Sequence, residues 1–246
     1  MKKIFMMMAL MLLMAFSSNV MALEEREVYY TNDNGVSLTK EEYDFVSKFY
    51  FDGYQKLMIK EDYDYIIDNK LMEGEIKTTI IEDYDEPYLR GDITHTTVSK
   101  QLRLSSSCPT SSCSMVLMLT WLKSPNVRSY DLIGAYSPTS GNLRFVNSVI
   151  YYDGDNAQYV EKRKESYGIS ATMKSPSSGE DIKIIMDFKA TKGTLVHASY
   201  QHAKEPISLT NSRKYSFIGS GYGGVFRFEE SVHDYYDAMS GIKTTI

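Results

Sequence analysis

Short apolar runs with a two-residue period dominate the chain after residue 75, and they restrict its fold more than any other feature. In the segment 182–189, Ile182, Ile184, Met186 and Phe188 alternate with residues that are mostly polar, which is typical of a strand with one buried face. Comparable runs occur at 78–81, 93–104, 115–123, 129–136, 143–152, 166–173 and 194–202. Evenly spaced strands without intervening helices predict a mainly β (α+β) fold, with an antiparallel β-sandwich or jelly-roll-like domain over 75–246.

Turn-forming residues separate these runs at 137–142, 153–156, 175–179 and 192–193. The 153–156 turn (DGDN) offers oxygen ligands for calcium, but it lacks the complete loop with a distal glutamate, so we expect a hairpin turn and no metal site. The glycine cluster at 219–224 lacks the residues of a phosphate loop or a nucleophile elbow and predicts a bend. Residues 215–228 are expected to add one or two strands, and residues 232–239 a short terminal helix.

Cys108 and Cys113 are the only cysteines in the chain, and they flank four loop-forming residues between two predicted strands. In an oxidising compartment they most simply pair with each other, because their spacing fits neither a redox motif nor a closed zinc site. If the two lie opposite each other, paired residue numbers sum to 221. Leu104 then faces Leu117, and Lys100 faces Trp121. A slip of one residue would turn the leucines away from the core.

Most helical signals lie in the N-terminal segment 23–74, where we expect a helical hairpin. Thr39 and Glu42 have the spacing of a capping box, and Gly53 is expected to interrupt the first helix. Residues 38–46 recur in similar form at 58–66, with Ile59 in place of the capping threonine, so the second helix should be less well capped. The two helices are expected to pack a tyrosine-rich face on the main domain; a protein-binding arm is the alternative.

The first 22 residues have the order of a signal peptide: Lys2 and Lys3, an uncharged run from 4 to 16, then small residues ending at Ala22. The run of 13 is short of the roughly 20 residues that a spanning helix needs. We therefore expect a secreted, extracellular protein without a membrane anchor. Removing the two lysines shifts the formal charge from −5 to −7, and a net acidic chain without a basic run is a poor partner for nucleic acid.

The segment 121–134 (WLKSPNVRSYDLIG) is the most distinctive stretch of the chain. Together with 50–54 (YFDGY) and 61–64 (EDYD), it resembles a family of uncharacterised secreted proteins from low-GC Gram-positive bacteria, which implies the compartment and type of source but no activity. Trp121 is expected to anchor the core, and Arg128 is expected to pair with Asp131. The alternative is a ligand-binding rim formed by Trp121, Arg128, Tyr130 and Asp131.

Familiar catalytic patterns are missing from the sequence. The four histidines form no zinc-protease spacing, and His197 and His202 would face opposite sides of a regular strand. The acid pairs are adjacent residues, which do not converge on one substrate. No catalytic residues and no cofactors are predicted. The favoured function is non-catalytic binding of an extracellular protein or glycan at the bacterial surface or its surroundings. A secreted glycan hydrolase or lyase and a structural subunit of a surface assembly remain open, as does the oligomeric state.

Cleavage by a signal peptidase is expected after Ala22, because Val20 and Ala22 are the small residues that the enzyme reads before its cut. The mass of protein recovered from the culture medium should match a chain that begins at Leu23. Full-length protein in the membrane fraction would contradict this prediction.

Overall fold

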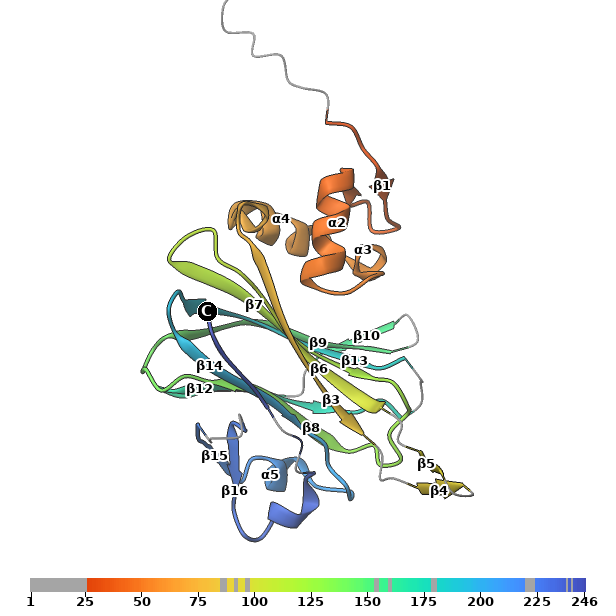
Figure 1. The fold of residues 1–246 in the computed structure, drawn as a ribbon, viewed down its shortest axis with the longest axis vertical. Helices are drawn as coiled ribbons and strands as arrows, with labels where there is room; N and C mark the ends of the chain where they lie inside the picture. Colours follow the sequence, from red (N-terminus) through yellow and green to blue (C-terminus); the bar gives the residue numbers. More distant parts are fainter. Residues whose placement is uncertain are drawn as a thin grey trace, which may run out of the picture.

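The alternating runs form two antiparallel sheets that pack face to face, so the predicted sandwich is confirmed (Figure 1). The computed structural model describes residues 26–246 apart from 85–87, 91–92, 96–97, 153–154, 159–160, 178–180, 220–223, 238 and 240. The predicted signal peptide, the first half of the 153–156 turn and most of the glycine cluster at 219–224 therefore lie outside the described residues. No described helix is long and apolar enough to cross a membrane.

Sheet I has the strand order β10-β9-β13-β7-β6-β3, and sheet II has the order β11-β12-β8-β14-β17. The strands of sheet I are β3 (Ile76–Tyr84), β6 (Val98–Ser107), β7 (Ser112–Trp121), β9 (Leu143–Tyr152), β10 (Asp155–Gln158) and β13 (Lys183–Thr191). Those of sheet II are β8 (Tyr130–Tyr136), β11 (Glu161–Lys164), β12 (Gly168–Lys174), β14 (Leu195–Gln201) and β17 (Ile242–Thr245). Short paired strands lie outside them: β1 (Tyr30–Thr31) with β2 (Ser37–Leu38), β4 (Tyr88–Arg90) with β5 (Ile93–His95), and β15 (Tyr215–Phe217) with β16 (Phe226–Phe228).

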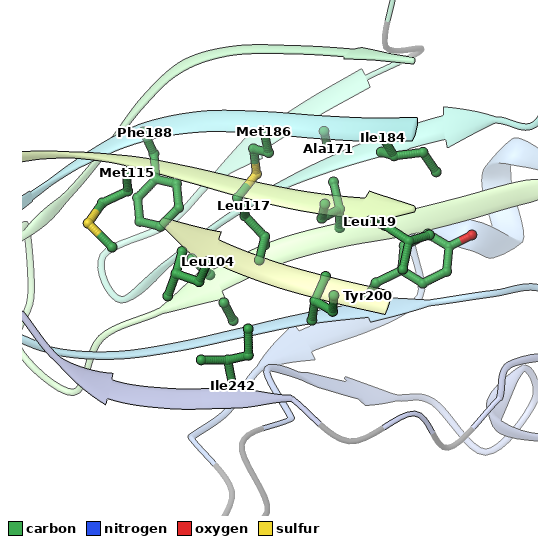
Figure 2. Close-up of a cluster of buried hydrophobic side chains, with 14 of the residues drawn as sticks. Leu104, Met115, Leu117, Leu119, Ala171, Ile184, Met186, Phe188, Tyr200 and Ile242 are labelled. Atoms are coloured by element: carbon green, nitrogen blue, oxygen red, sulfur yellow. The ribbon is translucent and has the colours of Figure 1, made fainter. Parts of the chain in front are cut away.

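The core lies between the two sheets and follows the parity of each strand. In β13 the even-numbered residues that the sequence marked as one face, such as Ile184, Met186 and Phe188, are at most 1% exposed. They pack with Leu117 of β7 and with Tyr200 of β14, which lies at one end of the cluster in Figure 2. Burial of this face fixes the register of every strand that contributes to it, since a one-residue shift would expose it.

The hairpin of β6 and β7 has the predicted register. Leu104 pairs with Leu117 and Lys100 with Trp121. The disulfide between Cys108 and Cys113 closes the hairpin, with the two Cα atoms 4.1 Å apart. Two segments of alternating residues joined by a short, cross-linked turn therefore contained enough information to define their pairing.

The N-terminal helices cover the outer face of sheet I. They are α2 (Lys40–Phe49), α3 (Tyr54–Leu57) and α4 (Lys60–Asp68), followed by a 3₁₀ turn, η1 (Leu71–Glu73). Side chains of α2, α3 and α4 pack on Val116, Met118 and Ile185 of the sheet, which supports the packing interpretation over a detached arm. The capping box of Thr39 and Glu42 is present. Before α4, only one of the two capping bonds is made. The Asp62 carboxylate accepts from the backbone N–H of Ile59, but Ile59 has no side-chain oxygen that could accept a bond in return.

The hairpin of β15 and β16 lies beside the outer face of sheet II, on the opposite side from the helices (Figure 1). Its side chains and their aromatic neighbours form what we call the aromatic layer: Tyr130, Tyr215, Phe217, Phe226, Phe228, Tyr235 and Tyr236. The hairpin of β15 and β16 presents Phe217 and Phe226 to two glycines of the sheet. A Cβ atom at Gly168 would lie 2.2 Å from the Phe217 ring, and one at Gly134 would lie 2.6 Å from Phe226. Only residues without a side chain allow the rings to approach this closely. A single helical turn, α5 (Leu209–Ser212), joins this layer to the sandwich.

Two sequence predictions need correction, and three strands of the sandwich were not predicted: β10, β11 and β17. The segment 93–104 was predicted as one strand, but β5 pairs with β4 outside the sheets, and β6 begins at Val98. The expected helix at 232–239 is a single 3₁₀ turn, η2 (His233–Tyr235), because Tyr236 forms a bridge with Ala203 instead. The C-terminal strand β17 was not predicted at all. Its four residues give too short a pattern, and its place depends on pairing with β14.

Replacing both cysteines with serine should leave a folded protein, because the hydrophobic register fixes the hairpin independently of the bond. The chain-entropy argument gives so short a loop about 2 kcal/mol of stabilisation. Urea denaturation should therefore show a loss of about 2 kcal/mol with an unchanged dependence on denaturant. An unfolded double variant would show that the register depends on the disulfide.

Asp187 is a buried carboxylate between the helices and sheet I. It lies on the outer face of β13, and its Oδ1 atom has no hydrogen-bond partner among the described residues. Burial raises the pKa of Asp187 well above its usual range, and the nearby charge of Asp62 in α4 raises it further. Tyr65 of α4 is also close to Asp187, and Lys189 of β13 lies 5.2 Å from the Tyr65 ring. Because the pKa of Asp187 is higher in the folded than in the unfolded chain, protonation of Asp187 favours the folded state at low pH. That contribution is lost as pH rises through the folded-state pKa.

Asp187→Asn should consequently stabilise the protein at about pH 8, by about 1–3 kcal/mol, and have little effect at about pH 4. Urea denaturation at both pH values measures the difference. Asp33→Asn, at an exposed position of the turn between β1 and β2, is the matched control and should change stability by less than about 0.5 kcal/mol at either pH. A stabilisation at Asp187 that is equal at both pH values would contradict the titration account.

Candidate functional site

The candidate site is built on one fully buried carboxylate, that of Asp131 near the start of β8. Its odd-numbered position points it inward, toward the end of the core, and its side chain is 0% exposed. Oδ2 accepts hydrogen bonds from the hydroxyls of Ser175 and Tyr200, each at 2.6 Å. Oδ1 lies 3.0 Å from Nδ1 of His202 and accepts a 2.9 Å bond from the backbone N–H of Ala203. A buried carboxylate needs such partners, and these four groups supply them.

Tyr200 and Trp121 extend this network through the end of the sandwich. The indole Nε1–H of Trp121 donates to the Tyr200 hydroxyl at 3.3 Å, so the tyrosine accepts one bond and donates another to Asp131. Burial raises the pKa of Tyr200 well above its usual range, and the charge of Asp131 raises it further. The phenol therefore stays protonated and remains a donor. The His202 ring lies edge-on to Trp121, with 4.8 Å between ring centroids.

Lys100 places a buried cation beside the same aromatic pair. Its Nζ atom lies 5.3 Å from the Trp121 ring centroid and forms ion pairs with Asp83, at 3.1 Å, and with Asp237. Asp237 also accepts a 3.1 Å bond from the backbone N–H of His202. Asp131 of β8 and Asp237 of the C-terminal segment therefore both hold His202, the first residue after β14.

A pocket of about 250 Å³ opens above this network, where β6 begins and β7 and β14 end. We call it the Trp121 pocket. It is lined by Ser99, Trp121, Lys123, Ser124, Pro125, Asn126, Val127, His202 and Lys204. Three of these side chains are basic, and none of the described residues that line it carries a carboxylate.

Among the described lining residues, His202 is the one whose side chain contacts the Asp131 carboxylate itself. A carboxylate that accepts from its other three partners has no hydrogen to donate. The hydrogen between Asp131 and His202 is therefore assigned to Nδ1 of the histidine. Nε2, on the other edge of the ring, has no hydrogen-bond partner among the described residues. The neutral ring thus presents a lone pair at Nε2, and the protonated ring presents a donor.

The structure brings together two of the four residues proposed from the sequence. Trp121 is 7% exposed and belongs to the core, as predicted, and it also lines the pocket. Asp131 lies beneath the pocket. Arg128 and Tyr130 do not line it. Arg128 donates to the Pro176 carbonyl at 2.9 Å, and Tyr130 packs in the aromatic layer. The expected pair of Arg128 with Asp131 is wrong, because His202 lies beside this carboxylate instead.

Sequence reasoning missed His202, Lys204 and Asp237 as members of the site. One signal was available for the histidine, since it shares the parity of Tyr200 and Ala198, which face the core. His197 has the opposite parity and lies on the other face of β14, where its ring centroid is 5.8 Å from that of Tyr136. No local pattern marks the other two residues, because the fold brings them together from distant segments.

A larger groove of about 710 Å³ lies elsewhere, between α2 and the start of β3. It is lined by Lys40, Glu41, Asp44, Phe45, Lys48, Met72, Gly74 and Ile76. Its charges are mixed, and Lys40 pairs with Asp44 within the groove. No buried polar network orients its side chains, so it is a weaker candidate than the Trp121 pocket. Among the residues described, no cluster of three or more histidine, cysteine or acidic side chains could hold a metal ion.

Two solved structures that match part of the chain are similar to it only at low sequence identity. No protein-family model and no curated protein match the chain, so the resemblance to a secreted Gram-positive family stays a prediction. The collagen-binding domain of Erysipelothrix rhusiopathiae surface protein RspB is 9% identical with a TM-score of 0.29, over 51% of this chain and 49% of that one. The chain thus spans about half the length of that domain.

A second match is the KRT10-binding region domain of the pneumococcal serine rich repeat protein PsrP. It is 12% identical with a TM-score of 0.25, over 52% of this chain and 88% of that chain. Both TM-scores are too low to transfer a site or a ligand to this chain.

Asp131→Asn should destabilise the protein strongly, because an amide nitrogen would meet hydroxyl and N–H donors that now share a carboxylate. The expected loss is about 3 kcal/mol or more in the free energy of unfolding. Asp234→Asn is the control, since the Asp234 side chain is 99% exposed, and it should change stability by less than about 0.5 kcal/mol. Equal effects of the two variants, measured by urea denaturation, would mean that the network does not support the fold.

Proposed function

We propose that the protein is an extracellular, non-catalytic binding protein that recognises a protein or glycan through the Trp121 pocket. The observation that carries this proposal is the satisfied hydrogen-bond network of Asp131, which holds His202 and Trp121 in place before any ligand arrives. A site that is ordered in advance loses less entropy on binding. The predicted export signal supports the extracellular location.

A hydrolytic function is supported less well by the same geometry. The pair of Asp131 and His202 has the orientation of a catalytic carboxylate and histidine, but a triad also needs a nucleophile within hydrogen-bond reach of Nε2. No described serine, threonine or cysteine is bonded to that atom. The described lining also lacks the two carboxylates that glycoside hydrolysis uses. Binding therefore remains the function that the pocket favours.

The direct test is a binding screen with the pocket blocked. Purified protein is applied to a panel of extracellular proteins and glycans as wild type, as Asn126→Trp and as Ser140→Trp. Asn126 is an exposed lining residue, so an indole there should fill the entrance without disturbing the core. Ser140 is exposed in a turn that does not line the pocket.

Wild type and Ser140→Trp should bind the same partner, and Asn126→Trp should bind it about tenfold more weakly or not at all. A partner that Asn126→Trp binds with full affinity would place recognition elsewhere on the protein. Hydrolysis of a panel glycan that is lost in His202→Gln would favour the enzyme alternative over ours.

A further inference from the structure

The charge of the Trp121 pocket opposes that of the whole chain. The protein carries a formal charge of −5, yet the lining includes Lys123, Lys204 and His202. Both lysines are exposed. The carboxylates nearest to the histidine are Asp131, below its ring, and Asp237, at its backbone N–H. Both are engaged in the network beside the pocket, and none of the described residues that line the pocket is acidic.

The bond between His202 and Asp131 leaves one ring nitrogen for an anion in the pocket. Asp131 occupies Nδ1 of this lining residue, so Nε2, which has no bonded partner among the described residues, is the ring nitrogen left for a ligand in the pocket. An anion in the pocket accepts hydrogen bonds and can take one from Nε2 only when that nitrogen carries a proton. Anion binding should therefore be coupled to protonation of the ring. The other charged group that packs against Trp121 is Lys100, which is already paired with acidic partners.

Size and packing favour a single side chain over a sugar chain. A volume of about 250 Å³ is below the roughly 300–1,000 Å³ of pockets that enclose larger small-molecule ligands. Stacking on a sugar ring would need an open aromatic face. Trp121 is only 7% exposed, and its ring is contacted by Lys100 and His202. The rest of the lining consists of Ser99, Ser124, Pro125, Asn126 and Val127, a mixture of polar and apolar groups that suits a peptide segment.

We propose that the Trp121 pocket binds the carboxylate side chain of an acidic segment in a protein partner, with Lys123, Lys204 and protonated His202 as its cationic contacts. This inference rests on the proposed binding function and specifies the chemistry of its ligand. The carboxylate takes charge-assisted hydrogen bonds from the three side chains. One proton is taken up at Nε2 for each ligand bound to a neutral ring.

The experiment uses three probes and three forms of the protein. The probes are an acetylated and amidated Gly-Ser peptide with one central glutamate, the same peptide with glutamine, and trigalacturonate as a glycan carboxylate. The proteins are wild type, Lys123→Gln/Lys204→Gln, and Lys164→Gln/Lys192→Gln. The last is a matched control because it removes the same charge at two exposed positions that do not line the pocket. Amide NMR spectra verify that each variant is folded and follow each titration.

The glutamate peptide should cause saturable shifts at Ser124, Asn126 and His202 in wild type and in the control. The pocket variant should bind about tenfold more weakly. Calorimetry in buffers of different ionisation enthalpy should show proton uptake at a pH where the ring is neutral. Equal binding of the glutamine peptide, tighter binding of trigalacturonate, equal losses in both variants, or no saturation would each overturn the inference. A partner from the panel that still needs the pocket would then leave the proposed function standing.

Discussion

The burial of one negative charge constrains this end of the sandwich more than any other interaction. Asp131 sits on the inward face of β8, where a carboxylate is costly unless donors surround it. Those donors come from the chain after β12, from β14 and from the two residues after β14. Satisfying the charge therefore fixes three segments relative to one another. The shape of the Trp121 pocket depends on the same network, because its lining residues His202 and Trp121 are bonded to it.

Tyrosines contribute to packing on both outer faces of the sandwich. A sheet that is covered on both sides needs side chains that combine a large apolar surface with a polar group at the boundary. Tyr50 and Tyr54 are buried under the helices, and Tyr215 and Tyr236 are buried in the aromatic layer. In the second layer, Gly134 and Gly168 make room for phenylalanine rings. The tyrosines named here serve packing rather than a continuous binding surface.

Local sequence patterns were sufficient to predict most strands, one hairpin register and the first helix. Alternation located most strands of the sandwich, and the spacing of Cys108 and Cys113 defined the register of β6 and β7. The capping box at Thr39 located the first helix. These features depend on residues close in sequence, whose geometry follows from strand or helix periodicity.

Long-range features were not predictable in the same way. Strand β17 is too short to show a period and is defined by β14. For the site, Trp121 and Asp131 were singled out, but their connection runs through Tyr200, 69 residues from Asp131. Lys123 and Lys204 border one pocket only because the ends of β7 and β14 meet there. A single sequence carries no signal for such meetings of distant segments.

The central claim is that Asp131 holds the ring of His202 through Nδ1 and leaves Nε2 free of hydrogen in the neutral ring. Long-range ¹H–¹⁵N correlation NMR at a pH where the ring is neutral measures this directly, with His202→Gln to assign the signals. The account predicts hydrogen on Nδ1 and a nitrogen without hydrogen at Nε2. A neutral ring with hydrogen on Nε2, or rapid exchange between both forms, would contradict it.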